Sequence, residues 1–263
     1  MSKLTKNEIK EHTKVLALLE HGNLTDDDEL FVFDNYRADA NHINSQSGAF
    51  FTPFGLAKDL AIHVPYTYEQ TVTVIDMCAG IGILSYAAAL GDNAWSRSHV
   101  DITCVEINPD YVEIGKKLVP QAKWICGDIL DPDFLKSLGY FDFAISNPPF
   151  GNINSNHRKA YKSNLFEYMV IEAASQIADS GAFIIPQMSA PFVFSGRTEY
   201  RELDDCRAKK FEEQTGITLN FNIGVDTAQY KNDWHGVAPV CEIVCCEFTE
   251  RTGQLTFDMF ESA

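Results

Sequence analysis

The chain has 263 residues, of which 45% are hydrophobic, so it can bury a sizeable core in one or two domains. Its formal net charge of −16 excludes a uniformly basic nucleic-acid-binding protein, because such proteins gain their non-specific affinity by neutralising phosphates. No apolar run is long enough to span a membrane, and the charged N-terminus lacks the apolar stretch of a signal peptide. We therefore expect a cytoplasmic protein without membrane contact.

Two N-terminal segments show apolar residues at helical spacing, residues 4–21 and residues 26–40. The first segment stops at Gly22, a residue type that commonly follows the last turn of a helix. We therefore expect an N-terminal helical extension over residues 1–45 and a catalytic domain over residues 46–263.

From residue 71 onwards, short β-rich runs alternate with helical stretches, which favours a doubly wound, mostly parallel sheet. The expected strands are 71–77, 99–107, 122–126, 141–146 and 181–186. Two further runs, 217–223 and 239–248, are joined by a loop too short for an ordinary crossover helix. The sequence thus predicts an α/β fold with a seven-stranded sheet that ends in a C-terminal antiparallel pair.

The first expected strand runs into a glycine-containing turn, Asp76-Met77-Cys78-Ala79-Gly80-Ile81-Gly82. Gly80 and Gly82 allow a sharp bend and a close approach of a ligand to the backbone. The third glycine position of the dinucleotide fingerprint holds Ser85, which disfavours a nicotinamide cofactor.

Acidic residues follow the next two expected strands. Glu106, with Ile107 beside it, stands where a carboxylate can accept hydrogen bonds from both hydroxyls of a ribose. Asp128, with Ile129 beside it, stands where a carboxylate can receive the amine of a cofactor adenine. Because these strand ends meet at one edge of a parallel sheet, we expect the residues to form one cofactor site.

The motif Asn147-Pro148-Pro149-Phe150 directly follows the fourth expected strand. The two prolines stiffen the turn and remove two backbone donors, so its carbonyl groups are free to accept hydrogen bonds. Asn147 Oδ1 and the Pro148 carbonyl can together accept both protons of an –NH2 group, and Phe150 offers a face for a planar base or amide. These residues are the predicted catalytic motif.

These motifs, preceded by Gly48-Ala49-Phe50-Phe51-Thr52-Pro53, resemble those of the adenine-N6 DNA methyltransferases of the gamma motif order. The resemblance covers about residues 46–190 and implies a Rossmann-like fold with S-adenosyl-L-methionine as cofactor. It places Phe51, Thr52 and Pro53 at the methionine end of that cofactor. The cofactor-binding residues that we expect are Phe51, Thr52, Pro53, Asp76, Cys78, Ala79, Gly80, Gly82, Glu106, Ile107, Asp128, Ile129 and Asn147.

The same resemblance puts Phe166 and Tyr168 on a helix that lines the pocket. Substrate contacts are expected from basic residues just after the catalytic motif and from aromatic residues in the loop 226–235. The candidates are Arg158, Lys159, Lys162, Tyr230 and Trp234. The seven cysteines form no Cys-x-x-Cys pair, and we expect no metal site.

The function expected from the resemblance is methyl transfer to the N6 amine of adenine in nucleic acid, with DNA favoured over RNA. Members of this family usually carry a separate target-recognition domain, for which the residues after Phe150 are few. We therefore expect specificity that is relaxed, read by inserted loops, or supplied by a second copy of the chain or a specificity subunit. RNA adenine or guanine amines remain an alternative substrate, as does a protein glutamine amide, although that last family carries Tyr where Phe150 stands. A non-catalytic inhibitor or adaptor that mimics nucleic acid is the alternative of another class.

Overall fold

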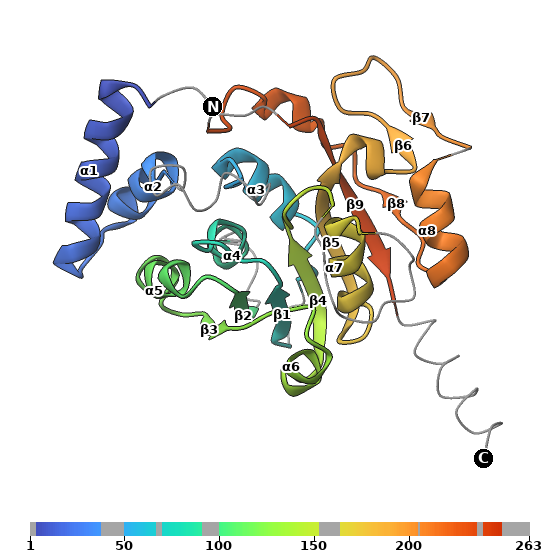
Figure 1. Ribbon diagram of the computed structural model, residues 1–263, viewed down its shortest axis with the longest axis horizontal. Coiled ribbons are helices and arrows are strands. Elements are labelled where there is room, and N and C mark those ends of the chain that lie inside the picture. The colour runs from blue at the N-terminus through green and yellow to red at the C-terminus, as the bar shows by residue number, and fades with distance from the viewer. Residues whose placement is uncertain are drawn as a thin grey trace.

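The computed structural model describes residues 4–37, 50–66, 70–90, 100–152, 164–204, 206–235 and 239–248. Within these residues, a central sheet of seven strands has the order β3-β2-β1-β4-β5-β9-β8 (Figure 1). The strands are β1 (Val72–Asp76), β2 (Val100–Glu106), β3 (Lys123–Cys126), β4 (Phe141–Ser146), β5 (Ala178–Pro186), β8 (Asn220–Phe221) and β9 (Cys241–Glu247). A separate two-stranded sheet pairs β6 (Phe192–Val193) with β7 (Arg201–Glu202).

Strands β1 to β5 are parallel, whereas β9 runs antiparallel to β5 and β8 runs antiparallel to β9. The expected Rossmann-like α/β fold with a C-terminal antiparallel pair is therefore confirmed. Strand β8 is much shorter than the expected run 217–223, because at Asn222 the side chain, and no longer the backbone, bonds to β9 and the chain turns out of the sheet. Its Nδ2 donates to the Ile243 carbonyl at 2.9 Å, and its Oδ1 accepts the N–H groups of Gly224 and Val225 at 2.7 Å.

Helices cover both faces of the sheet. One buried apolar cluster joins Val74 of the sheet to α1 (Lys6–His21), α2 (Asp26–Asn35), α3 (Phe54–Ala61), α4 (Ile83–Ala89) and α5 (Pro109–Leu118). The other cluster joins Ile75 to α6 (Pro132–Ser137), α7 (Phe166–Ala174) and α8 (Arg207–Thr215). Val74 and Ile75 belong to opposite clusters because successive side chains of a strand point to opposite faces.

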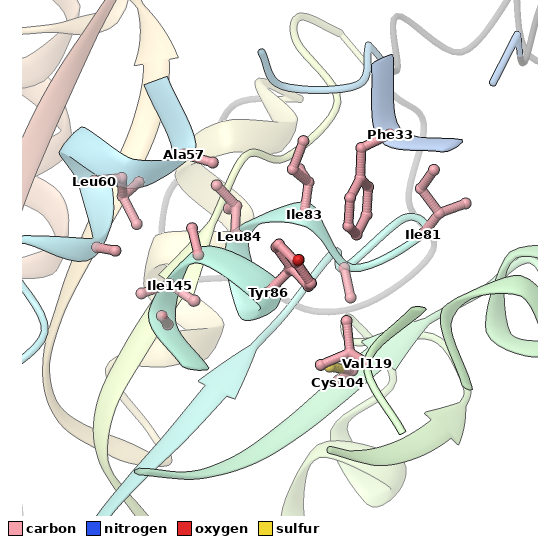
Figure 2. Packing of buried hydrophobic residues seen from close by; sticks show 14 of the residues in the cluster. Phe33, Ala57, Leu60, Ile81, Ile83, Leu84, Tyr86, Cys104, Val119 and Ile145 are labelled. Carbon is pink, nitrogen blue, oxygen red and sulfur yellow. The ribbon is translucent and has the colours of Figure 1, made fainter. Parts of the chain in front are cut away.

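The N-terminal helices exist as expected, and each begins at a threonine with a capping box. Helix α2 ends at Asn35, and residues 38–40 of the expected helix lie outside the described residues. Phe33 of α2 packs against Tyr86 of α4 with ring centroids 5.0 Å apart, as Figure 2 shows. The extension therefore shares the core of the sheet, and the proposed boundary at residue 45 stays a prediction.

Two short 3-10 helices, η3 (Gln187–Ser189) and η4 (Thr227–Tyr230), lie in the C-terminal half. Among the helices that the structure describes, none combines the length and apolar character that a membrane crossing needs.

Candidate functional site

The turn after β1 is fixed by its two glycines and by Glu106. Gly80 and Gly82 have φ of +57° and +99°, which side chains rarely tolerate. Glu106, at the end of β2, accepts the N–H of Gly80 at 2.9 Å on Oε2 and that of Asn108 at 2.8 Å on Oε1. Burial raises the pKa of Glu106 although these backbone donors oppose the shift. The ends of β1 and β2 are thus joined at the place where the sequence predicts a cofactor.

The two glycines are required for different reasons. A Cβ on Gly80 would lie 3.1 Å from the ring of Phe51, so this glycine brings the turn close to the segment before α3. A Cβ on Gly82 would meet Trp124 at 2.9 Å and Val119 at 3.0 Å. The packing of Trp124 and Val119 therefore requires a glycine at position 82, in addition to the close approach of a ligand that the sequence predicts.

Asp76 is completely buried at the end of β1. Its Oδ2 accepts the hydroxyl of Ser85 at 2.9 Å, while its Oδ1 is buried without a hydrogen-bond partner. Desolvation raises the pKa of Asp76 to about 7. A buried, incompletely satisfied carboxylate is costly, and such groups are most often found at functional sites.

Cys78 and Ala79 continue from this strand. Burial raises the pKa of the Cys78 thiol well above its usual value, which disfavours the thiolate form. Ala79 is buried and donates its N–H to the Val105 carbonyl at 3.0 Å. This hydrogen bond ties the turn after β1 to β2.

Ile107 and Ile129 behave differently although the sequence places each beside an acid. Ile107 is 65% exposed, a large apolar side chain left at the edge of the site. Ile129 is buried in the core, so its side chain is not available to a ligand in this structure. Asp128 is half-buried, and its Oδ1 accepts the N–H of Leu130 at 2.9 Å.

The catalytic motif is anchored by the side chain of Asn147. Its Nδ2 donates to the Phe50 carbonyl at 3.2 Å and to the Thr52 hydroxyl at 2.8 Å. A carbonyl can only accept, so the Phe50 contact fixes which end of the amide faces the segment before α3. Asn147 Oδ1 consequently faces away, and it is buried without a partner. A buried hydrogen-bond acceptor without a partner therefore lies directly after β4.

The other three residues of the motif follow Asn147 in sequence and differ in burial. Pro148 is buried, whereas Pro149 and Phe150 are half-buried. The Phe150 ring lies edge-on to Phe50, with centroids 6.5 Å apart. Thr52 and Pro53 are both buried, and Pro53 is the residue that precedes the first turn of α3. The structure therefore brings together the residues before α3 and the Asn-Pro-Pro-Phe motif, which are far apart in sequence.

An aromatic cluster beside the glycine turn was not predicted. Phe51 contacts Tyr111 of α5 at 5.4 Å and Tyr36, which follows α2, at 5.7 Å between ring centroids. Both tyrosines are buried, and burial raises the pKa of each phenol. No short motif marks these tyrosines, because their contacts are made between elements distant in sequence.

The structure supports few of the predicted substrate contacts. Arg158, Lys159 and Lys162 lie outside the described residues. Trp234 is only 5% exposed and packs in the core, so the expectation that its ring stacks on a base is corrected: no open face of the ring remains. Tyr230 packs against Gly55 and donates its hydroxyl to Asp59 Oδ2 at 2.5 Å, and so it joins η4 to α3.

The expectation that Tyr168 lines the pocket also needs correction. Tyr168 is fully buried, stacks on Phe211 of α8 with centroids 4.6 Å apart, and donates its hydroxyl to the Ser189 carbonyl at 2.7 Å. Phe166 packs against the same apolar cluster. The Tyr168 ring thus holds α7 and α8 together on the face of the sheet opposite to Phe51. The pocket role of Phe166, which is half-buried, stays a prediction.

Within the described residues, no group of three or more His, Cys, Asp and Glu side chains is placed to hold a metal ion.

Known proteins resemble this chain in sequence and in fold. The type II methyltransferase M.BsuBI of Bacillus subtilis is 28% identical in an alignment of 171 residues, and the match covers 54% of this chain and 34% of that protein. The chain thus spans about a third of the length of this relative.

Two solved structures share the fold. A methyltransferase subunit of a type I restriction-modification system from Streptococcus thermophilus matches with a TM-score of 0.55 and 15% identity, over 86% of this chain and 50% of that one. A protein from Listeria monocytogenes, described as a class I S-adenosylmethionine-dependent methyltransferase, matches with a TM-score of 0.52 and 12% identity, over 91% of this chain and 68% of that one.

The model of the methyltransferase small domain matches residues 57–191, which include the glycine turn, both acidic strand ends and the Asn-Pro-Pro-Phe motif. The chain therefore belongs to the methyltransferase small domain family, and its cofactor is S-adenosylmethionine.

Proposed function

We propose that this chain transfers a methyl group to the N6 amine of adenine in DNA. The observation that carries the proposal is the buried Asn147 Oδ1, which has no partner while the other end of the same amide is held by Phe50 and Thr52. A buried acceptor without a partner is expensive unless a ligand satisfies it. An exocyclic amine supplies the donor that this oxygen lacks.

The residues at the ends of β1 and β2 fit the cofactor. The Glu106 carboxylate suits a ribose, Gly80 lets the backbone approach a ligand, and the exposed Ile107 offers an apolar surface for a base. Phe51 would lie at the methionine end, as the resemblance implies. S-adenosylmethionine supplies the electrophilic methyl group when it is bound at these residues.

The protein's contribution to the reaction is to position the amine and to favour the charge that develops on it. Asn147 Oδ1 and the Pro148 carbonyl accept the two N–H groups of the target, which draws the nitrogen lone pair out of conjugation with the ring. The amide cannot rotate away, because Phe50 and Thr52 hold its nitrogen. Phe150 supports the plane of the base. Positioning of this kind needs no covalent intermediate.

DNA is proposed as the substrate because the motifs resemble those of adenine-N6 DNA methyltransferases and because a type II methyltransferase is the curated relative. The adenine of a duplex must first leave the stack, at a cost of a few kcal/mol. Sequence recognition is proposed to come from a specificity subunit or from a second copy of the chain, since the Streptococcus thermophilus protein of the same fold is itself one subunit of a restriction-modification system.

The test compares wild type with Asn147→Ala in tritiated methyl transfer to unmethylated DNA. We expect the variant to lose turnover by a factor of at least about 100, because the target amine loses a positioned acceptor, while calorimetry still detects S-adenosylmethionine binding. The control is Asn35→Ala, since the Asn35 amide donates to the Phe31 carbonyl of its own helix at 2.9 Å. Retained turnover in Asn147→Ala contradicts the mechanism.

A further inference from the structure

Glu167, in the first turn of α7, is buried beneath the catalytic motif. Its side chain is 1% exposed. Oε2 accepts the backbone N–H of Gly151 at 3.1 Å, and Oε1 accepts the hydroxyl of Ser189 at 2.7 Å. Gly151 is the residue that directly follows Phe150. The carboxylate therefore joins the end of the catalytic motif to η3, the turn that follows β5.

Gly151 is held on both sides of its own backbone. Its N–H is bound by Glu167, and its carbonyl accepts the N–H of Phe166 at 2.9 Å. Its φ of +97° belongs to the left-handed region, and a Cβ built there would meet nothing within 4 Å. The glycine is thus required by the backbone conformation, and the two hydrogen bonds to α7 maintain the direction in which the chain leaves the motif.

A carboxylate is an unusual choice for this position. A buried carboxylate loses its hydration and must recover it through hydrogen bonds, and an apolar residue would pack on α7 at no such cost. A backbone N–H, by contrast, needs an acceptor when it is buried. The hydrogen bond from the Gly151 N–H explains why an acceptor such as Glu167 stands at this position.

We propose that Glu167 is a positioning residue for methyl transfer: by holding Gly151, it keeps the Pro148 carbonyl and the Phe150 ring where the target amine meets them. This inference rests on the proposed role of the Asn-Pro-Pro-Phe motif. Glu167 acts as a hydrogen-bond acceptor and transfers no proton, so an uncharged acceptor of the same length can replace it.

The test compares Glu167→Gln, which keeps an acceptor for Gly151, with Glu167→Leu, which fills a similar volume without one. Tyr168→Phe is the matched control, because it removes a buried hydrogen bond of the neighbouring residue to Ser189 and leaves Gly151 untouched. Each variant is measured for thermal unfolding, for S-adenosylmethionine affinity by calorimetry, for kcat and KM with DNA, and for amide hydrogen exchange of residues 147–152.

We expect Glu167→Leu to lower kcat by about 10- to 100-fold with little change in cofactor affinity, the effect of a catalytic group displaced by a fraction of an ångström to one ångström. Exchange of residues 147–152 should rise in the same variant. Glu167→Gln and Tyr168→Phe should keep kcat within about threefold of wild type. If the leucine variant gives no cooperative melt, Glu167→Met replaces it.

A folded leucine or methionine variant with wild-type kcat and unchanged exchange overturns the inference, as does a glutamine variant as impaired as the leucine one. If the wild type methylates no DNA, the proposed function fails, whereas the exchange comparison still decides whether Glu167 holds the motif.

Discussion

Glu106 at the end of β2 accepts the backbone N–H of Gly80 in the turn after β1, at 2.9 Å. The same carboxylate accepts the N–H of Asn108, the residue that caps α5. One side chain therefore fixes the two segments that we propose as the cofactor site.

Replacing Glu106 by alanine should weaken S-adenosylmethionine binding by about 10- to 100-fold, since a hydrogen bond to a charged group contributes roughly 1.5–3 kcal/mol. Isothermal titration calorimetry measures the change. Glu113→Ala is the control: Glu113 lies exposed on α5, where it pairs with Lys116 at 2.6 Å. Equal affinities in wild type and Glu106→Ala would remove Glu106 from the cofactor site.

Gly82→Ala should destabilise the protein more than Gly139→Ala. Both glycines have positive φ, +99° and +89°, which costs an alanine about 1–2 kcal/mol. Only at Gly82 does the new Cβ also meet Trp124 and Val119, whereas Gly139 has open space. Overpacking adds about 1–3 kcal/mol. Urea unfolding measures the difference, and equal losses would show that the turn shifts without resistance.

Asp76→Asn should change how stability depends on pH. Burial raises the folded-state pKa of Asp76 from 3.8 to about 7, so the folded protein binds a proton that the unfolded chain releases. The free energy of unfolding of the wild type should therefore fall, relative to the variant, as the pH rises from about 4 to about 7. Chemical unfolding at several pH values gives the difference, and parallel curves would contradict the raised pKa.

Tyr36→Ala should reduce both stability and cofactor affinity, because Tyr36 packs against Phe51 at 5.7 Å between ring centroids. Removing a buried aromatic ring costs about 3–5 kcal/mol. Tyr36→Phe keeps the ring and should remain close to wild type. Unfolding and calorimetry on both variants separate the two effects. An alanine variant with unchanged affinity would mean that the N-terminal helices only complete the core.

Much of the fold follows from local sequence. The run 71–77 is apolar and β-branched, and a parallel sheet buries such runs on both faces, so its identity as a strand needs no tertiary information. The run 217–223 looks similar, but Ile217 and Leu219 insert into the cluster under α8 and Asn222 turns the chain away. The length of β8 is therefore decided by contacts with residues distant in sequence, and the periodicity of the run does not reveal such contacts.

The candidate site shows the same division. Asp76, Glu106 and Asn147 could be placed together because parallel strands end at one edge of their sheet. Trp234 was misjudged, since a tryptophan in a polar loop gives no sign that its ring is buried. Glu167 was missed for a related reason: its partners, Gly151 and Ser189, lie on other elements.

The most direct test of the account is nucleoside mass spectrometry after incubation with S-adenosylmethionine and either unmethylated genomic DNA or total RNA. We predict N6-methyladenine in the DNA digest with the wild type and its absence with Asn147→Ala. Methylated nucleosides in RNA alone would keep the amine chemistry and replace the substrate. A DNA digest without N6-methyladenine, from a protein that binds S-adenosylmethionine, would contradict the central claim.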